Sequence, residues 1–198
     1  GINVIDIGLL PTPVNYFSNF FWNKDQIDGS VQITGSHNPS DYNGFKFTFQ
    51  RESFFGDKIQ ELYAIMKNQQ YNKIDISNAN IVSKNIIPHY VDDIISKIKI
   101  NKKIKIIMDC GNAAGAIVAP EIFKKLNIDI EELYCDIDGT FPNHHPDPTV
   151  DSNLSVIVKK IINGDFDLGI AYDGDADRVV CLDSNGCIIR SDVLMCIF

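Results

Sequence analysis

The strongest constraint on the fold of this chain is the alternation of strand and helix patterns between residues 104 and 172. Ile104–Met108 is nearly continuously apolar and predicts a strand. Apolar residues at helical spacing predict a helix over Ala116–Leu126, and Ile128–Tyr134 supplies the next strand. Strands that alternate with helices predict an α/β fold of layered domains, with mixed, largely parallel sheets flanked by helices.

The second half continues with cap, hairpin and loop signals. Asp151 or Ser152 is expected to cap one helix, and Ser191 is expected to cap the last helix. Asn185-Gly186 separates two apolar runs and predicts a β-hairpin. The remaining elements expected here are a loop at Asp136–Thr149 and strands at Asp167–Tyr172, Val179–Leu182 and Cys187–Ile189.

The first half carries similar patterns. Gly56–Asn68 is a predicted helix with one apolar stripe, and Tyr71–Asn85 is a predicted loop with room for one edge strand. A further helix begins at Ile87, and we place a domain boundary near its end, so that residues 1–97 and 98–198 form two domains. The elements expected earlier are a strand at Ile2–Ile7 and a helix at Val14–Trp22.

A serine stands in a turn-rich loop between two strand patterns. Ser30–Thr34 and Phe45–Phe49 alternate apolar and polar residues and predict strands, the second of which carries Lys46. Ser36 and His37 could act as nucleophile and base, but adjacent side chains usually diverge, so residue types alone favour a plain surface hairpin. The residues that shape the loop around Ser36 are the turn-formers Gly35, Asn38, Pro39 and Gly44.

Three carboxylates and an arginine follow the predicted strand that ends at Tyr172: Asp173, Asp175, Asp177 and Arg178. In open α/β sheets, ligands bind at this carboxyl end of the strands. Carboxylates at alternate positions share one face of an extended chain, and a hard divalent cation such as Mg²⁺ relieves their repulsion. The alternative is an Asp-Gly turn whose carboxylates are simply solvated.

A cluster of this kind could also belong to a calcium-binding loop or to a phosphatase with an Asp nucleophile. A helix-loop-helix calcium loop requires Gly where Arg178 stands and Glu where Ser184 stands, so that interpretation is dropped. A phosphatase of the haloacid dehalogenase type would use Asp173 as nucleophile and Asp175 as acid and base. That hypothesis leaves the Ser36 loop unexplained, and it stays open as the second choice.

Composition bears on partners and compartment. The formal net charge is −8, and no run of Lys or Arg offsets it, so we expect no nucleic-acid-binding surface. No apolar run is long enough to span a membrane, so no membrane association is expected. The five cysteines form no Cys-x-x-Cys pair and lie mostly in apolar surroundings. This pattern favours reduced thiols in a cytoplasmic protein over disulfides or zinc.

Two uncommon strings resemble segments of the α-D-phosphohexomutases, most of all the phosphomannomutase/phosphoglucomutase branch. Residues 34–39 read Thr-Gly-Ser-His-Asn-Pro and, with residues 41–46, are similar to the active-serine loop of that family. Residues 173–178 read Asp-Gly-Asp-Ala-Asp-Arg and are similar to its metal loop. The resemblance spans the later part of the first domain and most of the second, with further matching segments at residues 5–8, 11–13, 111–115 and 141–148.

This resemblance implies specific roles for the site residues. Ser36 carries a phosphoryl group in the resting enzyme, and Lys46 and Arg178 offset the charge on the transferring oxygens. Lys46 is also a candidate proton carrier, and His37 orients the loop or the phosphoryl group. The implied ligands of Mg²⁺ are a phosphoserine oxygen on Ser36 and the carboxylates of Asp173, Asp175 and Asp177.

The implied reaction is a mutase reaction between hexose 1-phosphate and hexose 6-phosphate. The expected substrate is a phosphate of mannose or glucose, and a hexose 1,6-bisphosphate is the expected intermediate and activator. Two alternatives from other classes stay open: an Asp-nucleophile phosphatase and a non-catalytic module that binds sugar phosphates.

The chain starts at Gly1 inside a strand-like run and stops at Phe198 in the first turns of a predicted helix. We therefore expect a piece of a longer protein, whose missing domains are partners of this one. The resemblance implies that the sugar-selecting loop and the distal phosphate-clamping loop belong to those domains. The piece alone is accordingly expected to be inactive.

Overall fold

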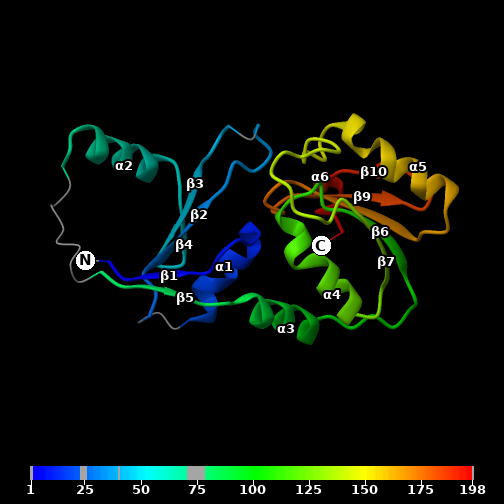
Figure 1. Cartoon of the computed structure of the whole chain (residues 1–198), viewed down its shortest axis with the longest axis horizontal. Coiled ribbons are helices and arrows are strands. Elements are labelled where there is room, and N and C mark those ends of the chain that lie inside the picture. The colour runs from blue at the N-terminus through cyan, green and yellow to red at the C-terminus, as the bar shows by residue number, and fades with distance from the viewer. Residues whose placement is uncertain (1, 23–25, 40, 71–78, 198) are drawn as a thin grey trace.

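The computed structural model describes residues 2–22, 26–39, 41–70 and 79–197. Two parts lie side by side in Figure 1. One extends from β1 (Val4–Asp6) to β5 (Ile81–Ser83), and the other begins at β6 (Lys105–Asp109). Helix α3 (Ile87–Lys97) connects them. No helix in these ranges is both long and apolar enough to cross a membrane.

The second part is built on a five-stranded sheet with the order β10-β9-β8-β6-β7. Strand β6 pairs in parallel with β7 and β8, whereas β9 pairs antiparallel with β8 and β10. The predicted strands of this half and the hairpin at Asn185-Gly186 are therefore confirmed. The other strands are β7 (Asp129–Leu133), β8 (Leu168–Tyr172), β9 (Val179–Asp183) and β10 (Ile188–Ile189).

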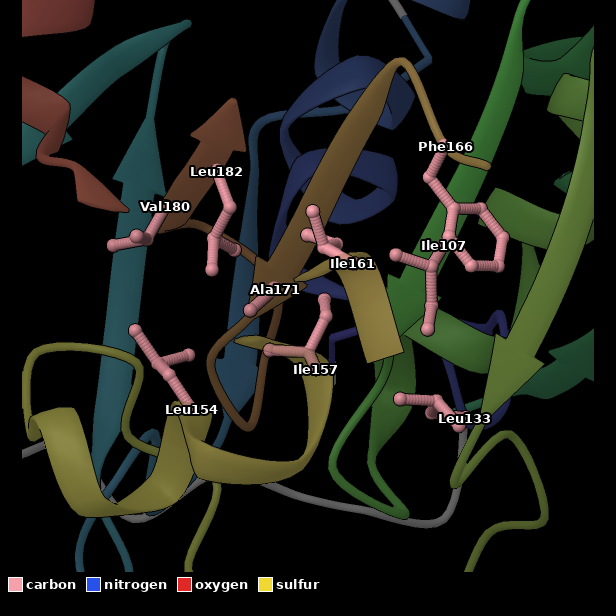
Figure 2. Close-up of a cluster of buried hydrophobic side chains, with 9 residues drawn as sticks. All are labelled: Ile107, Leu133, Leu154, Ile157, Ile161, Phe166, Ala171, Val180 and Leu182. Carbon is pink, nitrogen blue, oxygen red and sulfur yellow. The ribbon is translucent and has the colours of Figure 1, made fainter. Parts of the chain in front are cut away.

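Helix α5 (Ser155–Asn163) covers one face of this sheet. Ile157 and Ile161 lie on its inner side and are fully buried. Gly169 on β8 makes room for them, because a Cβ there would lie 2.5 Å from Ile161 Cδ1. Figure 2 shows the resulting cluster, which consists of Ile107, Leu133, Leu154, Ile157, Ile161, Phe166, Ala171, Val180 and Leu182.

The opposite face of the sheet packs against a helix that the sequence placed at Ala116–Leu126. The structure divides this segment into a 3₁₀ turn, η2 (Ala114–Ile117), and helix α4 (Ala119–Lys125). Pro120 lies in the first turn of α4, where its missing N–H and fixed φ favour a helix start. Pro120 therefore favours the start of a new helix after the 3₁₀ turn has ended at Ile117.

The predicted helix caps of this half are wrong. Asp151 and Ser152 belong to a 3₁₀ turn, η3 (Asp151–Leu154), which runs directly into α5 without a side-chain cap. The short last helix, α6 (Ser191–Leu194), follows Arg190, and the Ser191 hydroxyl donates instead to the Val179 carbonyl at 2.6 Å. In both places the side chain that could cap a helix is not hydrogen-bonded to a first-turn amide.

The first part contains an antiparallel sheet, β2-β3-β4, and a separate parallel pair, β1-β5. The sheet strands are β2 (Gly29–Ile33), β3 (Phe45–Phe49) and β4 (Glu52–Phe54). The register aligns Val31 with Phe47 and Ile33 with Phe45, so apolar side chains gather on one face. Four of them are at least 50% exposed, and together they form what we call the exposed apolar face: Val31, Ile33, Phe45 and Phe49.

The other face of this sheet is polar and meets helix α1 (Thr12–Phe21). Asn19 Nδ2 donates to Ser30 Oγ at 2.8 Å, and Ser30 Oγ donates to Asn15 Oδ1 at 2.7 Å. Because side chains alternate along a strand, Lys46 on β3 points to this same covered side. The sheet therefore directs Lys46 inward and its aromatic residues outward.

Helix α2 (Asp57–Lys67) is present as predicted, and its apolar stripe is only partly covered: Ile59 and Leu62 are half-buried, whereas Tyr63 and Met66 are exposed. The predicted loop at Tyr71–Asn85 contains β5, while its residues 71–78 lie outside the described residues. The α/β class, with mixed sheets flanked by helices, is confirmed.

Candidate active site

The loop that joins β2 to β3 presents Ser36. The Thr34 amide donates to the Gly44 carbonyl at 3.0 Å and closes the base of the loop. The Ser36 amide donates to Thr34 Oγ1 at 2.8 Å, and Ser36 itself has a φ of 51°, in the left-handed region. Non-glycine residues are uncommon in this region and cluster at functional sites. The hydroxyl is thus held in one direction by its own loop.

The loop after β8 presents the three carboxylates. Asp173 Oδ1 accepts from the amides of Asp177 and Arg178, each at 3.1 Å, so the first carboxylate organises the turn. Ala176 in the middle of the turn has a φ of 53°. Asp173 is fully buried and Asp175 is nearly so. The turn therefore holds two of its three carboxylates inside the protein, whereas Asp177 is exposed, so the solvated Asp-Gly alternative does not account for Asp173 and Asp175.

The two loops meet at Ser36, although 137 residues separate it from Asp173. Ser36 Oγ donates to Asp173 Oδ2 at 2.9 Å. Arg178 donates to the same carboxylate oxygen through Nε at 2.9 Å and Nη2 at 2.7 Å, and its Nη2 lies 3.3 Å from Ser36 Oγ. A Cβ on Gly174 would lie 2.0 Å from the Ser36 carbonyl oxygen, so only glycine permits this approach.

Lys46 supplies a second cation to the same cluster. Its Nζ lies 2.5 Å from Asp175 Oδ2 and 2.6 Å from Asp177 Oδ2. Burial of Lys46 favours its neutral form, but the hydrogen bonds to the two carboxylates outweigh burial, and the pKa of Lys46 is raised. The Lys46 side chain therefore stays positively charged in this arrangement, which suits charge neutralisation better than proton transfer.

The pKa values of two of the carboxylates, Asp173 and Asp175, shift in opposite directions. Burial raises the pKa of Asp173, although the hydrogen bonds from Arg178 act against burial. Burial also acts to raise the pKa of Asp175, but the hydrogen bonds from Lys46 and Thr12 outweigh it, and this pKa is lowered. The site thus keeps dense negative charge out of water and surrounds it with two cations.

The donor set fits a hard divalent cation. Asp173, Asp175 and Asp177 each offer one carboxylate oxygen, and these oxygens lie within 4.8 Å of one another. Asp175 Oδ1 is buried and has no hydrogen-bond partner among the residues described. A buried carboxylate oxygen without a partner is costly, and oxygen ligands are those that Mg²⁺ prefers. The three carboxylates could therefore hold Mg²⁺ beside Ser36.

His37 lies beside the serine, where its Nδ1 is 3.3 Å from Ser36 Oγ and also contacts Arg178 Nη2. The four predicted catalytic residues therefore gather in one place with the carboxylates: Ser36, His37, Lys46 and Arg178.

Family models match nearly all of this chain. The model described as phosphoglucomutase/phosphomannomutase, alpha/beta/alpha domain II, matches residues 88–186. The corresponding domain I model matches residues 1–73. The chain belongs to the phosphoglucomutase/phosphomannomutase family. The two loops of the site fall one in each matched domain.

Several curated members of the family are similar to the chain over its whole length. A phosphoglucomutase of Neisseria meningitidis serogroup A is 41% identical over 199 aligned residues, and a phosphomannomutase/phosphoglucomutase of Pseudomonas putida is 38% identical. In both cases the alignment covers 100% of this chain and 42% of the relative. The chain thus spans less than half the length of these relatives.

A solved structure from the family agrees with the fold. The crystal structure of a phosphoglucomutase/phosphomannomutase family protein from Burkholderia thailandensis superposes with a TM-score of 0.88 at 36% identity. The superposition covers 96% of this chain and 42% of that protein. The arrangement of both parts is therefore one that the family adopts.

Two residues that touch the site were not among the predicted site residues. Thr12 Oγ1 donates to Asp175 Oδ2 at 2.5 Å, and His145 Nε2 contacts the His37 carbonyl oxygen. Figure 1 shows the β2–β3 loop turned toward the loop before α5 that carries His145. Both residues lie in segments that resemble the family, and that resemblance was the only signal in the sequence.

Proposed function

We propose that the full-length protein is a phosphohexose mutase that interconverts hexose 1-phosphate and hexose 6-phosphate. The observation that carries the proposal is the 2.9 Å contact between Ser36 Oγ and Asp173, with Arg178 and Lys46 on either side. The names of the relatives, phosphoglucomutase and phosphomannomutase/phosphoglucomutase, support glucose or mannose phosphate as substrate.

In the proposed reaction Ser36 carries a phosphoryl group at rest. The bond between phosphorus and Ser36 Oγ breaks while a sugar hydroxyl forms a new bond to phosphorus, and the proton of that hydroxyl ends on the freed Ser36 oxygen. The product of this step is a hexose 1,6-bisphosphate. The sugar then reverses its orientation, Ser36 takes the other phosphoryl group, and the isomeric monophosphate leaves.

Transfer of this kind depends on alignment and on neutralisation of charge. Arg178 already spans Asp173 and Ser36, so its guanidinium is placed to neutralise oxygens on a phosphoryl group at Ser36. Lys46 supplies the second positive charge, and His37 orients the loop. Mg²⁺ held by Asp173, Asp175 and Asp177 would stabilise the serine oxygen as it leaves.

We also propose that further domains of the same polypeptide complete the protein. The exposed apolar face supports this, because large contiguous apolar surfaces usually mark an interaction site. A division into domains at residues 1–97 and 98–198 fits the start of β6 just after α3. All five cysteines are free thiols in the structure, which supports a cytoplasmic location.

The test is the Ser36→Ala variant of the full-length protein. Turnover of glucose 1-phosphate or mannose 1-phosphate should fall by at least about 1,000-fold, the scale seen when a covalent nucleophile is removed. Mass spectrometry of wild-type peptides, after incubation with a hexose 1,6-bisphosphate and Mg²⁺, should place a phosphoryl group on Ser36. Thr48→Val is the matched control, because Thr48 is buried on β3 and its hydroxyl has no hydrogen-bond partner among the residues described.

Two other results would replace this proposal. Wild-type turnover by Ser36→Ala, with phosphate release that depends on Asp173, would indicate the Asp-nucleophile phosphatase. Binding of hexose phosphate without turnover, and without phosphate on Ser36, would indicate a non-catalytic binding module.

A further inference from the structure

Thr12, the first residue of α1, is tied to the carboxylate loop by two hydrogen bonds. Its amide donates to the Asp175 carbonyl at 2.9 Å, and its hydroxyl donates to Asp175 Oδ2 at 2.5 Å. Amides in the first turn of a helix have no partner within the helix, so the first bond satisfies one of them. The threonine side chain is completely buried, and its hydroxyl is therefore held in place.

The two oxygens of Asp175 have different surroundings. Oδ2 accepts from both Thr12 and Lys46. Oδ1 is buried and has no partner among the described residues. Since a carboxylate has two oxygens at fixed spacing, holding Oδ2 fixes where Oδ1 points. The unpaired oxygen is the one that remains for a cation.

We propose that Thr12 is a positioning residue that aims Oδ1 of Asp175 at the cation. The inference rests on the proposed function, because it concerns the metal of that site. Lys46 alone cannot fix the carboxylate, since an ammonium on a flexible stem can pair with either oxygen. The hydroxyl of Thr12, on a short side chain anchored by its own backbone, removes that freedom. Partners of this kind typically change metal affinity 10- to 100-fold when lost.

The experiment measures Mg²⁺ binding to the full-length protein by isothermal titration calorimetry. Wild type, Thr12→Val and Thr12→Ser are brought to the same phosphorylation state of Ser36, verified by intact mass. Valine keeps the shape of threonine without its hydroxyl, and serine keeps the hydroxyl. We expect about tenfold weaker binding for Thr12→Val and binding within about threefold of wild type for Thr12→Ser.

Two further variants separate the role of Thr12 from a general effect of removing a buried hydroxyl and from loss of the metal site itself. Thr48→Val makes the same isosteric change at a buried threonine whose hydroxyl has no partner among the described residues, and it should bind Mg²⁺ like wild type. Asp175→Asn should lose Mg²⁺ binding if the cation uses this carboxylate. Unchanged binding by Asp175→Asn would count against the metal site of the proposed function and against Thr12 with it.

Three results would contradict the proposed role of Thr12 without contradicting the proposed function. One is wild-type affinity in folded Thr12→Val while Asp175→Asn has lost binding. A second is equal loss in Thr12→Ser and Thr12→Val. The third is a Thr12→Val protein that cannot fold, shown by near-ultraviolet circular dichroism, while Thr12→Ser folds, because the hydroxyl would then serve the fold itself.

Discussion

His144, which is partly buried, pairs with the buried carboxylate of Asp109. Asp109 is 1% exposed, and its Oδ2 lies 3.0 Å from His144 Nε2. The hydrogen bond to Asp109 raises the pKa of His144, although burial acts against it. The folded state therefore favours the protonated imidazole. Its contribution to stability is complete below the ordinary histidine pKa and is lost as the pH rises through the pKa in the folded protein.

We predict that His144→Gln lowers the free energy of unfolding by about 1.5–3 kcal/mol at pH 5.5, the range for hydrogen bonds to charged groups. The deficit should shrink at pH 8.5, because wild type has then lost its imidazolium. Urea unfolding of the 198-residue chain at both pH values measures this. With Asp109→Asn as the background, the same histidine substitution should show no such pH dependence. A deficit that grows with pH would contradict the prediction.

At the scale of single residues, the sequence predicted which side chains the fold brings together. Ser36 and the carboxylates that follow β8 were identified because their strings are uncommon and stand at strand ends. Thr12 and His145 were missed as contacts, because an ordinary threonine or histidine has no local pattern that names a partner more than 100 residues away. Such contacts become visible only when the fold brings the segments together.

At the scale of elements, periodicity located the strands and helices, and local chemistry set their ends. The β9–β10 hairpin formed at Asn185-Gly186 because this pair determines its own turn. The segment predicted as one helix at Ala116–Leu126 is divided at Val118, two residues before Pro120, and the predicted caps at Asp151 and Ser191 did not form. A side chain caps a helix only when the preceding loop points it toward the first-turn amides. An apolar pattern does not specify the path of that loop.

A prediction at the scale of elements concerns the close contact between the two site loops. Gly174→Ala would place a Cβ 2.0 Å from the Ser36 carbonyl oxygen, so the loops must move apart. Misplacement by about 1 Å can cost about 100-fold in rate, and we expect that loss in the phosphorylation of Ser36 by hexose 1,6-bisphosphate in the full-length protein. Phosphopeptide mass spectrometry at timed intervals measures it.

Gly139→Ala is the control for that experiment. Gly139 lies in the exposed loop before α5, and a Cβ there would meet nothing within 4 Å. It should be phosphorylated at the wild-type rate. Equal rates for the two alanine variants would show that the close contact at Gly174 has no role in phosphoryl transfer.

At the scale of the whole molecule, the exposed apolar face and the partly exposed helix α2 are surfaces that the proposed further domains could cover. We predict that the 198-residue chain alone performs no repeated turnover of glucose 1-phosphate with Mg²⁺, whereas the full-length protein does. The chain spans only 42% of its relatives, and a mutase must hold both ends of a bisphosphate. A coupled assay for glucose 6-phosphate compares the two proteins at equal concentration.

The exposed face offers a second measurement on the same pair. The isolated chain should bind a fluorescent hydrophobic dye more strongly than the full-length protein, because Val31, Ile33, Phe45 and Phe49 remain in contact with water. Sustained turnover by the isolated chain would refute the need for further domains. Equal dye binding by both proteins would show that the face stays open in the complete molecule.

The separation of Ser36 from its carboxylates also orders events during protein synthesis. The serine loop leaves the ribosome 137 residues before Asp173 does. At translation rates of about 5–20 residues per second, this interval is on the order of 10 s. Throughout it, the serine has neither the carboxylates nor Arg178, which the proposed transfer requires. Under the proposed function, a nascent or prematurely terminated chain without the second loop should not react with sugar phosphates, and the site can be completed only after that loop has been made and has docked.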